Sequence, residues 1–197
     1  MDNATIQPDG ETPSDVSQAI QIPQNIRNLH NKALAALERN NTDIAIDLFL
    51  KCVEQCPSFS AARRNLRLTE IARFKSSNGQ NSLAHHLSAL TGFLPEMNVK
   101  RLMKTGKLEE ALVECEKLLL KDPLNLSFVK LFAEVAIKAG HGDDGLMTLE
   151  IVREHLPPNN LAVLETMGRL YYQVKNYRKA RECLDKVHRA KPSDAAI

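Results

Sequence analysis

The chain has 197 residues, of which 43% are hydrophobic and only 5% aromatic, and it contains no Trp. This balance favours helices over sheets, because strands draw on β-branched and aromatic residues. No apolar stretch approaches the roughly 20 residues of a membrane-spanning helix, and no basic, apolar leader opens the chain, so we expect a cytoplasmic protein that does not enter the membrane.

The first 22 residues differ in composition from the rest of the chain. Residues 1–22 are rich in Asp, Pro, Ser, Thr, Gln and Asn, without a sustained apolar period. Such a segment cannot bury enough apolar surface to offset its conformational entropy, so we predict a disordered acidic tail. Residues 1–26 hold four acidic residues and no Lys or Arg, which leaves +2 − (−4) = +6 for the remainder. A moderately basic body suits an acidic or mixed partner surface but falls short of a nucleic-acid-binding footprint.

From about Pro23 onward, the apolar pattern predicts short amphipathic helices in pairs, each pair closing near a proline that stops the second helix. Tight turns within the pairs are predicted at residues 40–41, 105–106, 139–140 and 175–176. Two proline spacings are equal: Pro123 to Pro157 is 157 − 123 = 34, and Pro158 to Pro192 is 192 − 158 = 34. A period of 34 residues in helix–turn–helix units is typical of tetratricopeptide repeats.

The packing positions of the last two helix pairs carry a second signal. Gly168 and Ala180 are small residues where two helices must approach closely. The larger apolar positions around them are Leu164, Met167, Tyr171, Tyr177, Leu184 and Val187. In the preceding pair Gly145 replaces the usual Ala, at a cost of about 1 kcal/mol of helix propensity. We expect Asp143 or Asp144 to cap that helix.

These residues resemble the tetratricopeptide-repeat family over about residues 25–193. The resemblance implies an all-α fold, a right-handed α-solenoid of helix–turn–helix repeats. The stretch 59–95 departs from the pattern, because the proline spacings there are 95 − 57 = 38 and 123 − 95 = 28. A long helix over 60–75 and a second one over 83–90 form either a degenerate repeat or a helical insert. The expected organisation is a tail at 1–22 and a repeat domain at 23–197, with repeats at about 25–58, 59–95, 96–125, 126–159 and 160–193.

The resemblance also implies how the protein acts: first helices line a concave groove that holds a peptide or a partner helix. We therefore expect a scaffold or adaptor for protein–protein interaction. The side chains expected to face the groove are Arg27, His30, Leu34, Lys100, Met103, Lys104, Lys130, Glu134, Lys138, Glu165, Arg169, Tyr172 and Gln173. The lysines favour an acidic partner, although an ordinary solvated face explains them equally well. Some members clamp the carboxyl terminus of heat-shock chaperones, but Glu134 would repel a carboxylate there.

Other functional classes find little support in the residues. We expect no enzyme activity and no cofactor, because His85 and His86 form the only conspicuous ionisable pair and adjacent helical residues point in different directions. Cys52 and Cys56 lie one helical turn apart, but a metal site needs more ligands, and reduced apolar cysteines are the simpler interpretation. A cluster of arginines over 63–73 lacks the stacking aromatics of a nucleic-acid surface, so we do not expect nucleic-acid binding.

The last predicted helix, over 177–190, lacks a polar capping helix after it. We therefore expect an apolar flank there, with Leu184 and Val187 only half covered. Such a flank is compatible with self-association, with a truncated chain, or with the alternative function of a non-catalytic N-terminal interaction or regulatory arm of a larger protein.

Overall fold

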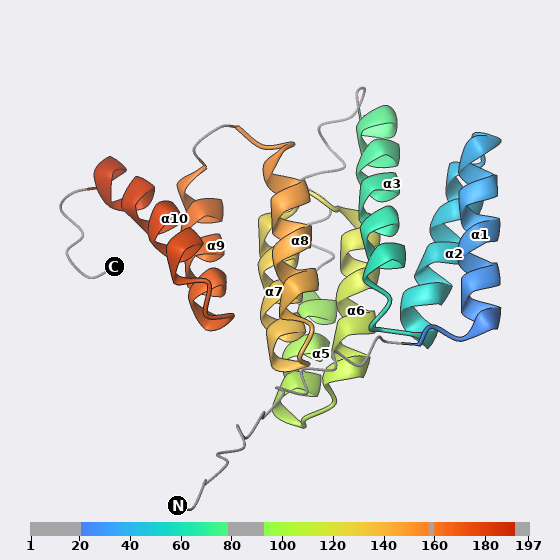
Figure 1. Ribbon diagram of the computed structural model, residues 1–197, viewed down its shortest axis with the longest axis horizontal. Coiled ribbons are helices and arrows are strands. Elements are labelled where there is room, and N and C mark those ends of the chain that lie inside the picture. The colour runs from blue at the N-terminus through green and yellow to red at the C-terminus, as the bar shows by residue number, and fades with distance from the viewer. Residues whose placement is uncertain (1–20, 79–92, 158–159, 192–197) are drawn as a thin grey trace, which may run out of the picture.

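The computed structural model describes residues 21–78, 93–157 and 160–191, and all regular structure within these ranges is helical (Figure 1). The helices are α1 Gln24–Glu38, α2 Thr42–Gln55, α3 Ser60–Asn78, α5 Phe93–Lys104, α6 Leu108–Lys121, α7 Leu126–Lys138, α8 Gly142–Arg153, α9 Leu161–Gln173 and α10 Tyr177–Ala190. The predicted helix over 83–90, with His85 and His86, lies outside the described residues, as does the predicted tail up to residue 20. Ile22 is half-buried and packs on the core, so the packed chain starts before the predicted boundary.

Four helix pairs in the described residues turn in the same way. The turn residues Asn40, Gly106, Gly140 and Lys175 have positive φ angles of 59°, 75°, 84° and 62°. In each turn the next residue donates its N–H to the carbonyl five residues back, over 2.7–3.0 Å. This is the Schellman arrangement, which satisfies the last carbonyls of the first helix while the chain reverses. The predicted turns are confirmed, and each follows from residues within one short segment.

Glycines allow close approach in the last two pairs. A Cβ on Gly168 would lie 2.7 Å from the Leu184 side chain of α10, and one on Gly145 would lie 3.2 Å from the Ala133 backbone of α7. Gly145 lowers the helix propensity of α8, but its missing side chain allows α8 to lie directly against α7. The capping prediction was wrong: α8 begins at Gly142 after an uncapped His141, and Asp144 is buried in an ion pair instead.

The apolar interior consists of two clusters. One runs through α5 to α10 and includes Ile71 of α3, and the other joins α1, α2 and the first half of α3. Helix α3 lies between them and contacts both α2 and α8, as Figure 1 shows near the centre of the molecule. In a regular solenoid each repeat contacts only its neighbours. The α3–α8 contact departs from that rule, so the irregularity expected near residues 59–95 is a change in how α3 packs.

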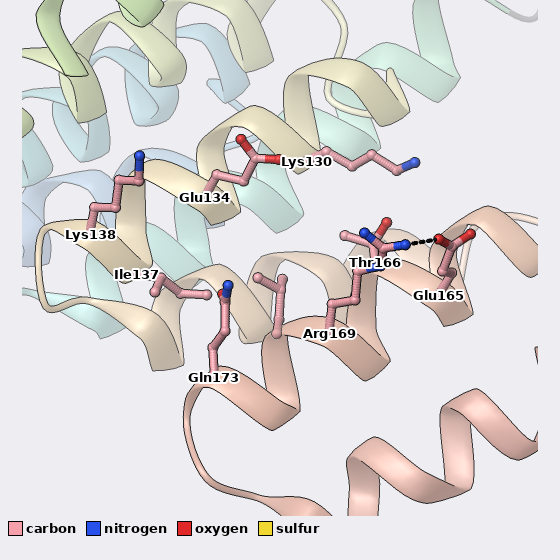
Figure 2. Close-up of a pocket in the computed structure, with 9 residues that line it drawn as sticks. Lys130, Glu134, Ile137, Lys138, Glu165, Thr166, Arg169 and Gln173 are labelled. Carbon is pink, nitrogen blue, oxygen red and sulfur yellow. Dashed lines mark hydrogen bonds and ion pairs between the residues drawn. The ribbon is translucent and has the colours of Figure 1, made fainter. Parts of the chain in front are cut away.

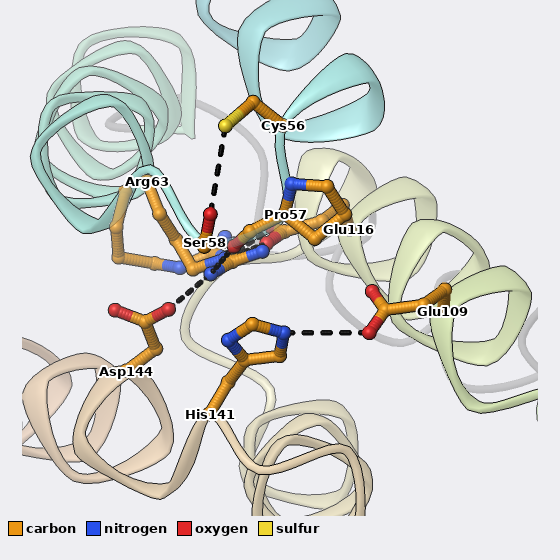
Figure 3. Close-up of polar contacts among 9 residues, drawn as sticks. Cys56, Pro57, Ser58, Arg63, Glu109, Glu116, His141 and Asp144 are labelled. Atoms are coloured by element: carbon orange, nitrogen blue, oxygen red, sulfur yellow. Dashed lines mark hydrogen bonds and ion pairs between the residues drawn. The ribbon is translucent and has the colours of Figure 1, made fainter. Parts of the chain in front are cut away.

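Buried charges hold α3 in this position (Figure 3). Arg63 donates from Nε to Glu116 Oε1 of α6 at 2.9 Å and from Nη1 to Asp144 of α8. Arg67 donates to Glu116 Oε2 at 2.5 Å and to Glu70. All five side chains are at most 4% exposed. Two arginines of the cluster over 63–73 are therefore buried ion-pair partners, and their guanidinium groups are not offered to solvent.

Helix α10 does not have the expected apolar flank. Val187 is 1% exposed and Cys183 is buried, while Leu184 is half-buried as predicted. The outward positions carry Arg178 and Arg181, whose side chains are 84% exposed and pair with acidic residues one turn later. The described outer face of α10 is therefore charged, which removes the reason for expecting self-association through it.

All four cysteines are buried free thiols. Cys52 donates from Sγ to the carbonyl of Ile26 at 3.8 Å, and burial raises its pKa to about 11. Among the described residues, no group of three or more His, Cys, Asp or Glu side chains could hold a metal ion. None of the described helices combines the length and apolar character needed to span a bilayer.

Candidate functional site

Helices α7 and α9 form a groove of about 380 Å³, which we call the α7/α9 groove (Figure 2). Its lining residues are Lys130, Glu134, Ile137, Lys138, Glu165, Thr166, Arg169, Leu170 and Gln173. Side chains from α7 form one wall, and side chains from α9 form the other. The structure therefore brings together six of the side chains that the sequence predicted for a groove: three from each helix.

Local sequence explains why these side chains share a face. Asn125 caps α7 by accepting the N–H of Ser127 at 3.0 Å, and Asn160 caps α9 by accepting the N–H of Val163 at 3.2 Å. Such caps fix where a helix starts. Lys130 lies five residues after its cap (130 − 125), and Glu165 lies five residues after its own (165 − 160). The two walls therefore present equivalent helical positions.

The α7 wall carries Lys130, Glu134 and Lys138, which follow one another at four-residue intervals and so share one side of the helix. Lys130 is half-buried, and the other two are exposed. Across the described part of the chain, none of the three has an ion-pair partner within 4.0 Å. These charges are available to a binding partner.

The charges on the α9 wall pair with each other. Arg169 donates from Nη2 to Glu165 Oε1 at 2.7 Å, one turn apart on the same helix. At equivalent positions the two walls carry opposite charges, Lys130 against Glu165 and Glu134 against Arg169, yet no ion pair within the described ranges joins them. Because no ion pair of the described residues connects the two walls, an occupant can lie between them.

The floor of the groove was not found by sequence reasoning. Ile137 is half-buried and packs against the main apolar cluster, and Leu170 is only 3% exposed. Thr166 donates its hydroxyl to the Ala162 carbonyl at 2.7 Å and so presents its methyl-bearing side chain. These floor residues could have been found from the sequence, because each borders the predicted charged face. Ile137, for example, follows Glu134 by three residues.

The three groove residues predicted on α1 are not part of this site. Arg27 and Leu34 are exposed, but α1 lies at the opposite end of the described helices from α9 (Figure 1). His30 is half-buried, with its ring 4.9 Å from that of Phe59. Its Nε2 lies 3.0 Å from the Asn65 amide nitrogen of α3, and burial lowers the pKa of His30. Its role is to pack α1 on its neighbours.

The predicted residues on α5, together with Tyr172, also lie outside the groove. Lys100 and Lys104 are exposed and line a separate hollow along α5. Met103 is half-buried and packs against the main apolar cluster. Tyr172 is 64% exposed, but its ring lies 5.5 Å from that of Tyr177 and does not line the groove.

A family model described as tetratricopeptide repeat matches residues 161–194, the segment that forms α9 and α10. Residues 161–194 are a tetratricopeptide repeat. The first helix of this repeat, α9, supplies one wall of the groove. The α7–α8 pair shares the Schellman turn and the Asn cap of the tetratricopeptide repeat, so the first helices of two pairs with the same local geometry line the site.

Solved structures with a similar arrangement include YrrB, described as a TPR protein with an unusual peptide-binding site. It is 20% identical over 84% of this chain and 86% of that chain, with a TM-score of 0.43. A tetratricopeptide repeat protein from Parabacteroides merdae is 16% identical over 87% of this chain and 69% of that chain, with a TM-score of 0.45. A comparison with curated protein sequences gives no match.

Proposed function

We propose that this chain is a non-catalytic scaffold that binds a polypeptide segment of a partner protein in the α7/α9 groove. The observation that carries the proposal is the groove itself, where charged side chains stand over an apolar floor formed by Ile137 and Leu170. An apolar floor favours binding by removing hydrophobic surface from water. Charged rims add orientation and specificity.

The shape of the groove supports a polypeptide over a small molecule. Its lining runs from residue 130 to 138 on α7 and from residue 165 to 173 on α9, so each wall covers eight residue steps (138 − 130 and 173 − 165), or about 12 Å at 1.5 Å per step. A chain that continues past both ends of such a groove can gain contacts that a small ligand cannot.

The lysines predicted an acidic partner, and we keep only a slight preference for negative charge in this proposal. The charged lining residues are Lys130, Lys138 and Arg169 against Glu134 and Glu165, an excess of one positive charge. An excess of that size favours a partner segment with a slight negative charge. It does not support a strongly acidic one.

The experiment is a selection from a random peptide library on the purified chain, followed by fluorescence anisotropy with the selected peptides. We expect the pair of changes Lys130→Glu and Lys138→Glu to weaken binding at least tenfold. The control pair, Lys32→Glu with Lys51→Glu, changes exposed lysines on α1 and α2 by the same total charge and should bind normally. Hydrogen exchange should show protection in α7 and α9. Equal loss in both pairs, or protection confined to other helices, would reject the groove.

A further inference from the structure

The charges on the α7 wall alternate in sign along the groove. Lys130, Glu134 and Lys138 lie about 6 Å apart along the helix axis, because four residues rise about 1.5 Å each. Within the described ranges all three lack ion-pair partners, whereas Glu165 and Arg169 on α9 satisfy each other at 2.7 Å. An occupant therefore meets unsatisfied charge on one side only, in the order positive, negative, positive.

The construction of the groove favours an extended occupant over a helical one. Its whole lining comes from two helices, α7 and α9. An extended segment is about 4.7 Å wide in its narrow direction, whereas a helix with its side chains is about 10 Å wide in every direction. The narrower segment can reach the floor between the two walls more readily.

The repeat of an extended chain matches the spacing of the wall. Alternate side chains of an extended segment point to the same side and lie about 6.6–6.8 Å apart, close to the 6 Å step of the α7 charges. We infer that the α7/α9 groove selects an extended segment with an acidic, a basic and an acidic residue at alternate positions. This inference rests on the proposed function and names the chemistry of its ligand. The pattern reads the same in both chain directions, so it does not depend on the orientation of the bound segment.

The intervening positions of the bound segment point away from the α7 charges. They face the α9 wall, where Glu165 and Arg169 already satisfy each other and Leu170 lies at the floor. Small uncharged residues such as Val suit these positions, because no unpaired charge meets them there and Val favours an extended backbone. The core of a matching segment is therefore acid–apolar–base–apolar–acid.

The first test compares three labelled peptides of equal length in the anisotropy assay. One has the core Asp-Val-Lys-Val-Asp, the second has the inverted core Lys-Val-Asp-Val-Lys, and the third has the first composition in the order Asp-Asp-Val-Val-Lys. We expect the first peptide to bind about tenfold more tightly than either of the others, with a difference that shrinks as salt is raised. Equal affinities for the three peptides would overturn the inference.

The second test exchanges a charge across the interface. In the variant Glu134→Lys we expect the preference at the central position to reverse, so that Asp-Val-Asp-Val-Asp binds more tightly than Asp-Val-Lys-Val-Asp. Glu134 is exposed, so the fold should tolerate the change. The control is Glu54→Lys, an exposed position on α2 that should leave the wild-type ranking intact. An unchanged ranking in Glu134→Lys would overturn the inference.

The proposed function and the charge pattern of the ligand can be disproved separately. If library peptides protect α7 and α9 but share no charge pattern, the charge order is wrong while the groove remains the binding site. If the selected peptides protect only other helices, the proposed function itself fails. Selection of the alternating pattern, with protection in α7 and α9, supports both.

Discussion

Arg63 of α3 and Glu116 of α6 form an ion pair in which Nε lies 2.9 Å from Oε1 and both side chains are 1% exposed. Arg67, one helical turn after Arg63, donates to the other carboxylate oxygen of Glu116 at 2.5 Å. One carboxylate therefore binds two arginines of α3, and Asp144 of α8 binds Arg63 as well. Both guanidinium carbons lie 5.7 Å from the centre of the Phe132 ring, which adds a cation–π contact. Together these contacts fix α3 on α6 and α8.

Removing the shared carboxylate should destabilise the fold strongly. We expect Glu116→Gln to lower the free energy of unfolding by about 3 kcal/mol, because it leaves two buried arginines short of a negative charge. The measurement is urea unfolding followed by circular dichroism. The control, Glu114→Gln on the same helix, breaks a surface pair with Lys117 at 2.8 Å and should cost less than about 1 kcal/mol.

If Glu116→Gln gives no folded protein, the variant Asp144→Asn tests the same network through its second carboxylate. It removes one partner of Arg63 and leaves Glu116 in place. A loss in either network variant no larger than that of Glu114→Gln would contradict the anchoring role.

The same network should make stability depend on pH. Burial raises the pKa of Glu70 to about 8 from an ordinary value of 4.5, although Arg67 acts to lower it. Between these two values the folded state holds a proton that the unfolded state releases, so stability falls as pH rises through this window. The slope contributed by one such group reaches about 1.4 kcal/mol per pH unit.

The measurement is a series of urea unfolding curves from pH 5.5 to pH 7.5, for wild type and Glu70→Gln. The amide cannot titrate, so the variant should lose the part of the slope that Glu70 contributes. Parallel pH dependences in the two proteins would show that folding does not raise the pKa of Glu70.

Gly168 and Leu184 lie so close within the tetratricopeptide repeat that the effects of substitutions at the two positions should not be additive. Gly168→Ala places a Cβ 2.7 Å from Leu184, and we expect a net loss of about 1 kcal/mol because overpacking outweighs the gain in helix propensity. In the Leu184→Ala background the same change should be neutral or stabilising, since the obstructing side chain is gone. Thermal unfolding of the four proteins measures the coupling. Additive effects would contradict the contact.

The turns predict opposite effects for two substitutions at equivalent positions. Lys175 has a φ of 62°, so Lys175→Gly should stabilise the protein by about 1 kcal/mol by relieving left-handed strain. Gly140→Ala should destabilise it by a similar amount, for conformational reasons alone, because an added Cβ would meet no atom within 4 Å. Shifts in melting temperature of opposite sign test this, and shifts of the same sign would reject it. Asn40→Gly should change little, since Asn tolerates this conformation.

The positions of the turns and of the groove walls were within reach of the sequence. The Schellman turn at Gly140 depends on residues from Ala136 to His141, and a chain period places Glu134 and Arg169 at equivalent helical positions. Such features need only neighbours in the chain or a regular repeat. The sequence therefore determined the helix pairs, their turns and the six charged or polar residues that α7 and α9 bring to the groove.

The placement of α3 was decided only by the tertiary structure. Arginines are usually exposed, so nothing in the local sequence indicates that Arg63 and Arg67 are buried. Their burial depends on Glu116, which is 53 residues from Arg63, and on Asp144, which is 81 residues from it. The position of α1, and with it the role of His30, follows from the same packing. Sequence period determines which face of a helix is apolar, but only the folded chain decides which helix covers it, because that choice rests on contacts between residues that no local pattern connects.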